Sequence, residues 1–140
     1  MTVWYKDSFE KEAAEFNKTI SELLGKDGTA EQANNLLNKM KDAYSAARPQ
    51  MLTDSVWRGL KNTDSWGILM MAHVKDVIKR NATINGQRTV VPIIKEIIGP
   101  RARCPIILQH NNYYTLIAGN TRLMICKLLE IPPRVVVIKI

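Results

Sequence analysis

The spacing of the apolar residues changes near residue 104, and this change constrains the fold more than any other feature of the sequence. Before it, apolar residues recur every three or four positions, as they do on one face of a helix. One such stripe covers residues 8–24 and a second covers residues 29–48, with the short run "GKDG" between them. Thr29 followed by Gln32 is typical of a capping box at a helix start. These two segments are therefore expected to form an antiparallel pair of helices.

The middle of the chain gives weaker signals for shorter elements. The expected order is a turn at residues 56–60, a helix from residue 63 or 64 to about 80, a loop with an Asn85-Gly86 turn, and a short helix that Thr89 caps and Gly99-Pro100 ends. A strand over the run "TVV" remains an alternative to the start of that last helix.

After residue 104 the apolar residues alternate with a period of two, which is the pattern of β-strands. Strands are expected over residues 105–108 and 113–118, joined by the turn "QHNN", and over residues 134–140. A helix is expected over residues 121–130, ended by "IPP". A helix between two strands permits a parallel crossover, so the three strands are expected to lie in one sheet.

These elements predict an α+β protein in which a helical N-terminal half is followed by a small mixed β-sheet. The expected division is a helical hairpin extension over residues 1–60 and a basic domain over residues 61–140, packed together as one unit.

Two features bear on where the protein resides. The longest apolar runs, "WGILMMA" and "RVVVIKI", are far shorter than the roughly 20 residues that span a bilayer, and the first residues hold no apolar signal core. Cys104 and Cys126 have neither a CxxC nor a zinc-type spacing, so we expect small buried hydrophobes in a reducing compartment. The expectation is a cytoplasmic protein without membrane contact.

The net charge of +7 belongs to the second half of the chain. Residues 1–60 carry eight Lys and Arg against nine Asp and Glu, whereas residues 61–140 carry twelve against four. A half-chain this positive attracts polyanions, of which nucleic acid is the commonest. The alternative is a surface that is basic without a polyanionic partner.

At Gly119 the sequence passes from strand to helix, and this turn is the main candidate for a functional site. A glycine there lets an anion approach the backbone, and the free N–H groups of the first helical turn carry the positive end of the helix dipole. Arg122 adds a planar guanidinium that suits two phosphate oxygens, and Asn120 or Thr121 can bind a ligand. The alternative is that Asn120 caps its own helix and Arg122 faces water.

The run "CPIILQHNNYYTLIAGNTRLMICKLLEIPPRVVVIKI", residues 104–140, resembles the core of the ParB/sulfiredoxin-like superfamily. That core has a "PI" strand, a turn, a Y-x-L-I-x-G strand, a GxxR helix start, a short helix, "IP" and a valine-rich strand. The resemblance implies that Gly119, Asn120, Thr121 and Arg122 bind nucleotide or nucleic-acid phosphate. The whole chain is similar to a stand-alone ParB-like module of phage and mobile-element genomes, where nuclease or DNA-binding roles are assumed.

The chain also departs from the superfamily in ways that narrow its chemistry. Sulfiredoxins carry a catalytic cysteine where this chain has Asn120, so sulfinic-acid repair is excluded. ParB proteins carry Glu-Arg-Arg after the glycine, of which only Arg122 remains here. Hydrolysis of a nucleotide or a phosphodiester, and thus whether the chain is an enzyme, stays open.

Two functions remain as hypotheses. The first is a ParB-like module that binds a nucleotide (CTP, ATP or ADP, with Mg²⁺ open as a companion) or DNA. The second is a non-catalytic protein that binds a protein partner, such as a phage factor with a host protein, through the N-terminal helices. Second-tier site residues are Arg101 and Arg103 as phosphate contacts, His110 as an acid or base, and Glu96 as a magnesium ligand or catalytic group. No metal-ligand spacing is present, and the oligomeric state is left open.

Overall fold

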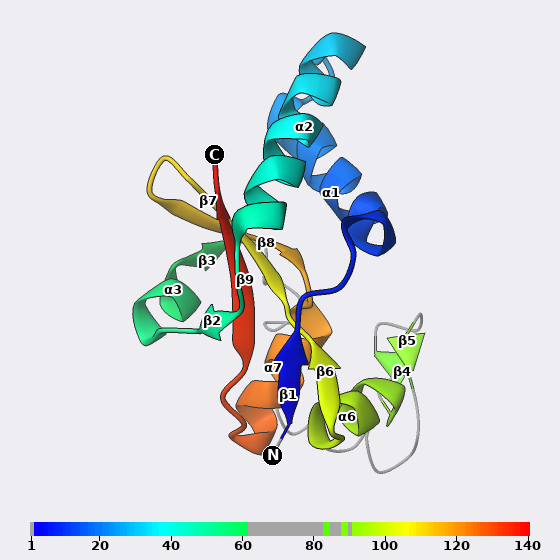
Figure 1. Ribbon diagram of the computed structural model, residues 1–140, viewed down its shortest axis with the longest axis vertical. Helices are drawn as coiled ribbons and strands as arrows, with labels where there is room; N and C mark the ends of the chain where they lie inside the picture. The colour runs from blue at the N-terminus through cyan, green and yellow to red at the C-terminus, as the bar shows by residue number, and fades with distance from the viewer. Residues whose placement is uncertain (1, 62–82, 85–87, 90) are drawn as a thin grey trace.

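The computed structural model describes residues 2–61, 83–84, 88–89 and 91–140. The helix expected over residues 63–80 and the Asn85-Gly86 turn lie outside these residues. Two N-terminal helices pack on a mixed β-sheet, so the expected α+β class is confirmed (Figure 1).

The helical hairpin consists of α1 (Phe9–Leu24) and α2 (Ala30–Ala46). The Ser8 side chain accepts a hydrogen bond from the Lys11 N–H and caps α1. Thr29 and Gln32 form the expected capping box at the start of α2. These caps satisfy N–H groups that have no partner within the helix, which is why both helices begin where the sequence indicates.

The central sheet has the order β2–β9–β7–β8–β3. Its core is the three strands that alternation predicts: β7 (Ile106–His110), β8 (Tyr113–Ala118) and β9 (Arg134–Lys139). The β7–β8 turn places Asn111 and Asn112 at positive φ, the geometry that suits a tight hairpin. Helix α7 (Asn120–Leu129) joins β8 to β9, and the parallel partner of β9 is β7 rather than β8.

Several short strands were not expected from the sequence. β1 (Val3–Tyr5) pairs in parallel with β6 (Arg101–Arg103), while β2 (Gln50–Met51) and β3 (Leu60–Lys61) form the two edges of the central sheet. Strands of two or three residues are too short to show alternation, and their partners lie far away in the sequence. Residues 1–60 therefore supply strands as well as helices, and the division at residue 60 remains a prediction.

Three further short elements complete the described chain. α3 (Asp54–Gly59) matches the expected turn. β4 (Thr83–Ile84) and β5 (Arg88–Thr89) pair antiparallel where a loop was expected. α6 (Val91–Ile98) is the expected short helix with Pro92 in its first turn, and Thr89 before it pairs with Thr83 in the β4–β5 ladder.

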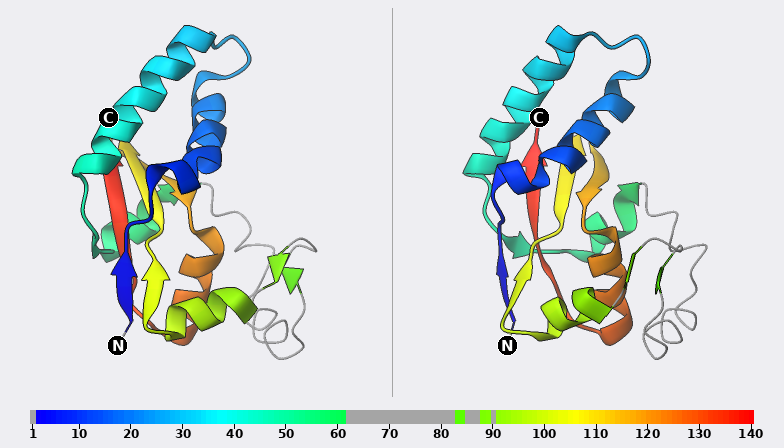
Figure 2. Two further views of the ribbon diagram at one scale, coloured as in Figure 1. Left: turned by 45° about the vertical axis from the view of Figure 1, so that its right-hand side comes forward. Right: turned by 90° about the vertical axis from the view of Figure 1, so that its right-hand side faces the viewer.

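One apolar core joins the hairpin to the sheet. It contains Phe16 and Met40 from the helices, Ile106 from the sheet and Ile125 from α7, all fully buried. Figure 2 shows the hairpin leaning over one end of the sheet and continuing beyond it. No helix among the described residues is long and apolar enough to cross a bilayer.

Replacement of Phe16 by Ala tests whether the hairpin belongs to this core. Phe16 is 0% exposed, and its ring centre lies 4.7 Å from that of Phe9 and 5.4 Å from that of Tyr44. The variant is expected to lose about 3–5 kcal/mol of unfolding free energy in urea titrations. Leu23→Ala, in the same helix but 42% exposed, is the control and is expected to change it by less than about 0.5 kcal/mol. Equal losses would mean that the hairpin does not share the core.

Candidate phosphate site at the start of α7

Gly119 separates β8 from α7 in a conformation that favours glycine. Its φ is 98°, in the left-handed region, and its carbonyl accepts the first helical hydrogen bond from the Leu123 N–H at 2.9 Å. A Cβ built on Gly119 would lie 2.7 Å from the Pro105 Cβ. The fold itself therefore requires this glycine, and its presence needs no ligand to explain it.

The first turn of α7 has no side-chain cap. Gly119 occupies the N-cap position and has no side chain that could accept a hydrogen bond from the helix N–H groups. The alternative in which Asn120 caps its own helix is therefore wrong, since Asn120 is the first residue inside it. The positive end of the helix dipole lies at this turn.

A pocket of about 350 Å³ adjoins this helix start. It lies where α1, β6 and α7 come together. The polar side chains that line it are Lys11, Glu12, Glu15, Arg103, Thr121 and Arg122. The second-tier residue Arg103 therefore lines the same pocket as Gly119, Thr121 and Arg122.

Arg122 is buried, so the alternative in which its guanidinium simply faces water is wrong. It is 6% exposed, and Thr121 beside it is 8% exposed. The positive charge of Arg122 acts on the carboxyl groups of Glu12 and Glu96. The guanidinium thus lies within a polar cluster that α1 helps to enclose.

Glu12 is a buried residue of this pocket that the sequence analysis missed. It is 6% exposed, and burial raises the pKa of its carboxyl group although Arg122 and Arg103 act to lower it. A signal for its burial was present: Glu12 lies four residues before Phe16 and eight before Ile20, on the apolar face of α1. Apolar residues are expected on such a face, whereas a carboxylate there indicates a buried polar group that needs a partner.

Glu96 and Arg103 hold each other at the edge of the pocket. The Arg103 backbone N–H and Nε donate to Glu96 Oε2 at 2.7 and 3.0 Å, and Nη2 donates to Oε1 at 3.3 Å. Burial alone would raise the pKa of Glu96, but these bonds and the charge of Arg103 outweigh it, and the pKa is lowered. Both oxygens that a magnesium ion would need already accept hydrogen bonds.

The other second-tier residues lie away from the pocket. The Arg101 guanidinium lies over the Tyr5 ring, 4.3 Å from its centre. His110 is at the far end of the β7–β8 hairpin, about 13 Å along the strand from the Ile106–Ala118 pair that adjoins Gly119. In the part of the chain that the structure describes, no three His, Cys, Asp or Glu side chains gather to hold a metal ion.

The two cysteines are buried, as expected from the sequence. Burial raises the pKa of Cys104 to about 11 and that of Cys126 to about 12, so both thiols stay protonated at neutral pH. They serve as small core residues rather than as nucleophiles.

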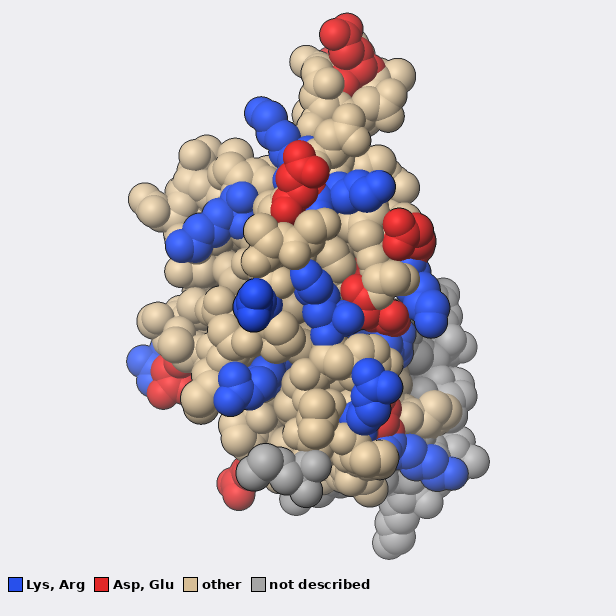
Figure 3. Space-filling view, viewed as in Figure 1, with Lys and Arg blue, Asp and Glu red and all other residues tan. Residues whose placement is uncertain are grey.

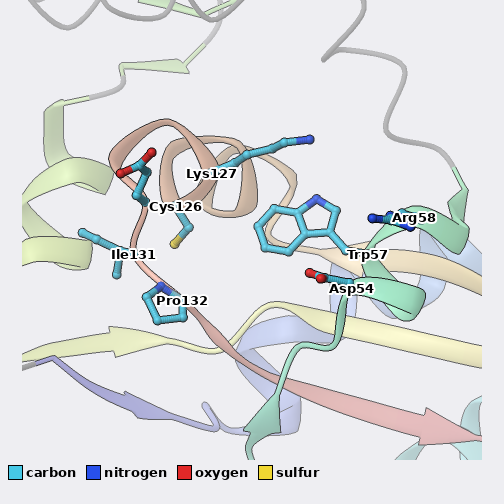
Figure 4. A pocket seen from close by; sticks show the side chains of 8 residues that line it. Asp54, Trp57, Arg58, Cys126, Lys127, Ile131 and Pro132 are labelled. Atoms are coloured by element: carbon cyan, nitrogen blue, oxygen red, sulfur yellow. The ribbon is translucent and has the colours of Figure 1, made fainter.

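A second pocket, of about 370 Å³, lies at the other end of α7. Figure 4 shows the Trp57 indole on one side, Ile131 and Pro132 on the other, and the Cys126 thiol between them. The Lys127 Nζ lies 6.0 Å from the centre of the Trp57 ring. The charged residues that line this pocket are Asp54, Arg58, Lys127 and Glu130. Two are positive and two are negative, so their charges do not favour one class of ligand.

Comparison with known protein families, with curated proteins and with solved structures gives no match for this chain. The ParB-like resemblance therefore remains a hypothesis based on the order of the motifs in residues 104–140.

Replacement of Gly119 by Ala tests the contact that fixes the helix start. The change places a Cβ against Pro105 and forces a side chain into positive φ, so we expect a loss of about 2–4 kcal/mol in urea unfolding. Gly25→Ala is the matched control, because its φ is 69° but its Cβ would meet nothing within 4 Å. It is expected to cost about 1 kcal/mol. A cost for Gly119→Ala no greater than for Gly25→Ala would contradict the role of Pro105.

Glu96 and Glu12 are expected to affect stability in opposite ways as the pH changes. The pKa of Glu96 is lowered in the folded state. Its contribution to the free energy of unfolding is therefore present above the unfolded-state pKa of about 4.5, and it is lost as the pH falls through the folded-state pKa. The pKa of Glu12 is raised in the folded state. Its contribution to the free energy of unfolding is therefore present below the unfolded-state pKa of about 4.5, and it is lost as the pH rises through the folded-state pKa.

The measurement is urea unfolding of Glu96→Gln and Glu12→Gln between pH 3.5 and pH 7. Relative to the unmodified protein, Glu96→Gln should become less stable as the pH rises, by about 1–3 kcal/mol at pH 7. Glu12→Gln should become relatively more stable over the same range. Glu10→Gln, at an exposed position of α1, should show no trend. Parallel trends for Glu96→Gln and Glu12→Gln would refute the assignment.

Proposed function

We propose that this chain is a ParB-like module that binds a phosphate group of a nucleotide or of DNA at the N-terminus of α7. The observation that carries the proposal is the pocket of about 350 Å³ at this helix start, which Gly119, Thr121 and Arg122 line together with Lys11 of α1. The order of β7, β8, α7 and β9 agrees with the superfamily core that residues 104–140 resemble.

The chemistry of the pocket suits a phosphate oxygen. Backbone N–H groups at a helix start donate to anions, and a planar guanidinium donates to two oxygens at once. Lys11, which is exposed on α1, adds a mobile positive charge at the rim of the pocket. Arg103 contributes less to phosphate binding, because its Nε and Nη2 already donate hydrogen bonds to Glu96.

The surface supports a polyanionic partner more than a neutral one. Figure 3 shows Lys and Arg predominating over the middle of the face that carries β1, β9 and the base of α2, while Asp and Glu lie at the tip of the hairpin, below it and along the right-hand side. Arg48, Arg134 and Lys139 are exposed on elements of this face. Such a field raises the rate at which nucleic acid meets the protein.

The proposal is limited to binding. Of the carboxylates near the pocket, Glu96 accepts hydrogen bonds from Arg103, and Glu12 is buried within the charge field of Arg122. Glu15, which is partly buried, lines the pocket beside Glu12, and the proposal assigns no cleavage step to any of the three.

A second candidate is the protein-binding role, and one observation favours it. From Ser21 to Asn35 every residue except Leu24 and Ala33 is exposed, so the end of the hairpin projects without packing on the sheet. A projecting helical hairpin of this kind is a common form of docking surface for a protein partner.

Ligand-induced stabilisation separates the two candidates. The protein is unfolded in urea with CTP, ATP, ADP or a short DNA duplex; a ligand at about 100 times its dissociation constant should stabilise it by about 2.7 kcal/mol. Lys11→Ala is expected to weaken binding about twofold to fivefold, because an exposed charge pair contributes about 0.2–1 kcal/mol.

Lys18→Ala is the matched control, since Lys18 is exposed two turns along the same helix and does not line the pocket. It should leave the affinity unchanged. No stabilisation by any of the four ligands would reject the phosphate-binding proposal and favour the protein-binding one.

A further inference from the structure

An apolar groove of about 540 Å³ lies between β1 and the segment that leads into β9. Trp4 of β1 lines it together with Met51, Ile98 and Ile131. Met51 and Ile98 are each 61% exposed, so the groove presents apolar side chains to the solvent. Its volume is within the range of roughly 300–1,000 Å³ that is typical of ligand pockets.

β1 borders this groove with an edge that has no strand partner among the described residues. The one described strand that pairs with β1 is β6, in parallel. The Val3 N–H donates to the Pro100 carbonyl, and the Tyr5 carbonyl accepts from the Cys104 N–H. These bonds direct the backbone groups of the first and last residues of β1 toward β6, so those of Trp4 lie on the opposite edge. Figure 1 shows β1 between β6 and β9, and the opposite edge therefore borders the groove.

The segment across the groove is unsuited to pair with this edge. It contributes Pro132 and Pro133 to the lining, and proline has no backbone N–H to donate. The carbonyl of Trp4 therefore cannot accept a hydrogen bond from either residue. An open strand edge beside an apolar groove is the arrangement by which a sheet takes up an extended peptide as an added strand.

The charges around the groove favour an acidic peptide. Arg134 lines the groove and is exposed, and no Asp or Glu is among the described residues that line it. Figure 3 shows Lys and Arg predominating over the middle of the face that carries β1 and β9. Nucleic acid fits this groove less well, because Trp4 is 8% exposed and does not offer its ring face to a stacking base.

We propose that the open edge of β1 binds an extended acidic segment of a protein partner as an added strand. Main-chain hydrogen bonds to Trp4 hold the segment along β1, and one of its apolar side chains enters the groove beside Ile98. Its carboxylates lie near Arg134. The groove shares no lining residue with the pocket at the start of α7, so the inference does not depend on phosphate binding there.

The probes are two matched panels of seven-residue peptides. In the first panel a central apolar residue (Val, Ile, Leu, Met or Phe) is flanked by Thr and then by Asp or Glu, and in the second panel Lys replaces each acidic residue. Each peptide is titrated into the ¹⁵N-labelled full chain. At least one acidic peptide is expected to bind about fivefold more tightly than its Lys counterpart. It should also slow hydrogen exchange of the Trp4 amide and leave the amides of residues 120–123 unchanged.

Two variants with matched controls locate the binding surface. Arg134→Gln is expected to weaken the acidic peptide about threefold, whereas Lys139→Gln, exposed at the other end of β9 and outside the groove lining, should not. Ile98→Ser is expected to weaken it about tenfold, because an apolar contact is lost. Leu129→Ser, exposed at the end of α7 and outside the groove lining, is the control for that change.

Three results would each overturn the inference. They are the lack of any acidic peptide that binds more tightly than its Lys counterpart, unchanged exchange of the Trp4 amide in every complex, and equal effects of Arg134→Gln and Lys139→Gln. Slower exchange of the Trp4 amide with a short DNA duplex and with no peptide would replace the peptide by nucleic acid as the partner of this edge.

Discussion

The close contact between Gly119 and Pro105 is the constraint on which the candidate site depends. Pro105 leads into β7 and Gly119 follows β8, so the contact closes the end of the β7–β8 hairpin where Ile106 faces Ala118. A residue with a Cβ would be forced into a position 2.7 Å from Pro105 and into a strained φ. The chain therefore turns at this glycine, and the turn directs the start of α7 toward α1. The pocket is a consequence of a packing requirement in the sheet.

The second determinant is that α1 covers this helix start and brings carboxylates with it. An uncovered helix start would present Arg122 to water. Here Glu12 and Arg122 are both buried, and burying charges costs several kcal/mol unless they interact closely. The charges that line the pocket come from two segments that are more than 100 residues apart in the sequence, with Glu12 on α1 and Arg122 on α7.

Local signals in the sequence were sufficient for the elements they specify. Ser8 and Thr29 place the helix starts because capping depends on neighbouring residues alone, and the Asn111-Asn112 turn fixes the β7–β8 hairpin for the same reason. The β1–β6 pair was not predictable, since two three-residue strands some 95 residues apart carry no periodic pattern.

Exposure at the site was predicted less well than its location. Sequence spacing correctly brought Gly119, Thr121 and Arg122 to one helix start, but whether Arg122 meets water depends on what packs above it. Only the position of Glu12 on the apolar face of α1 indicated a buried polar partner, and that clue becomes readable once α1 is known to lie over α7.

Stability alone gives little reason for a buried glutamate and arginine at this place. Well-packed apolar residues of similar volume often serve a core equally well or better, whereas an unpaired member of such a cluster is strongly destabilising. Phe16 and Ile20 already hold α1 on the core one and two turns beyond Glu12. The anchoring of α1 is therefore supplied by neighbouring residues, and Glu12 and Arg122 are not needed for it.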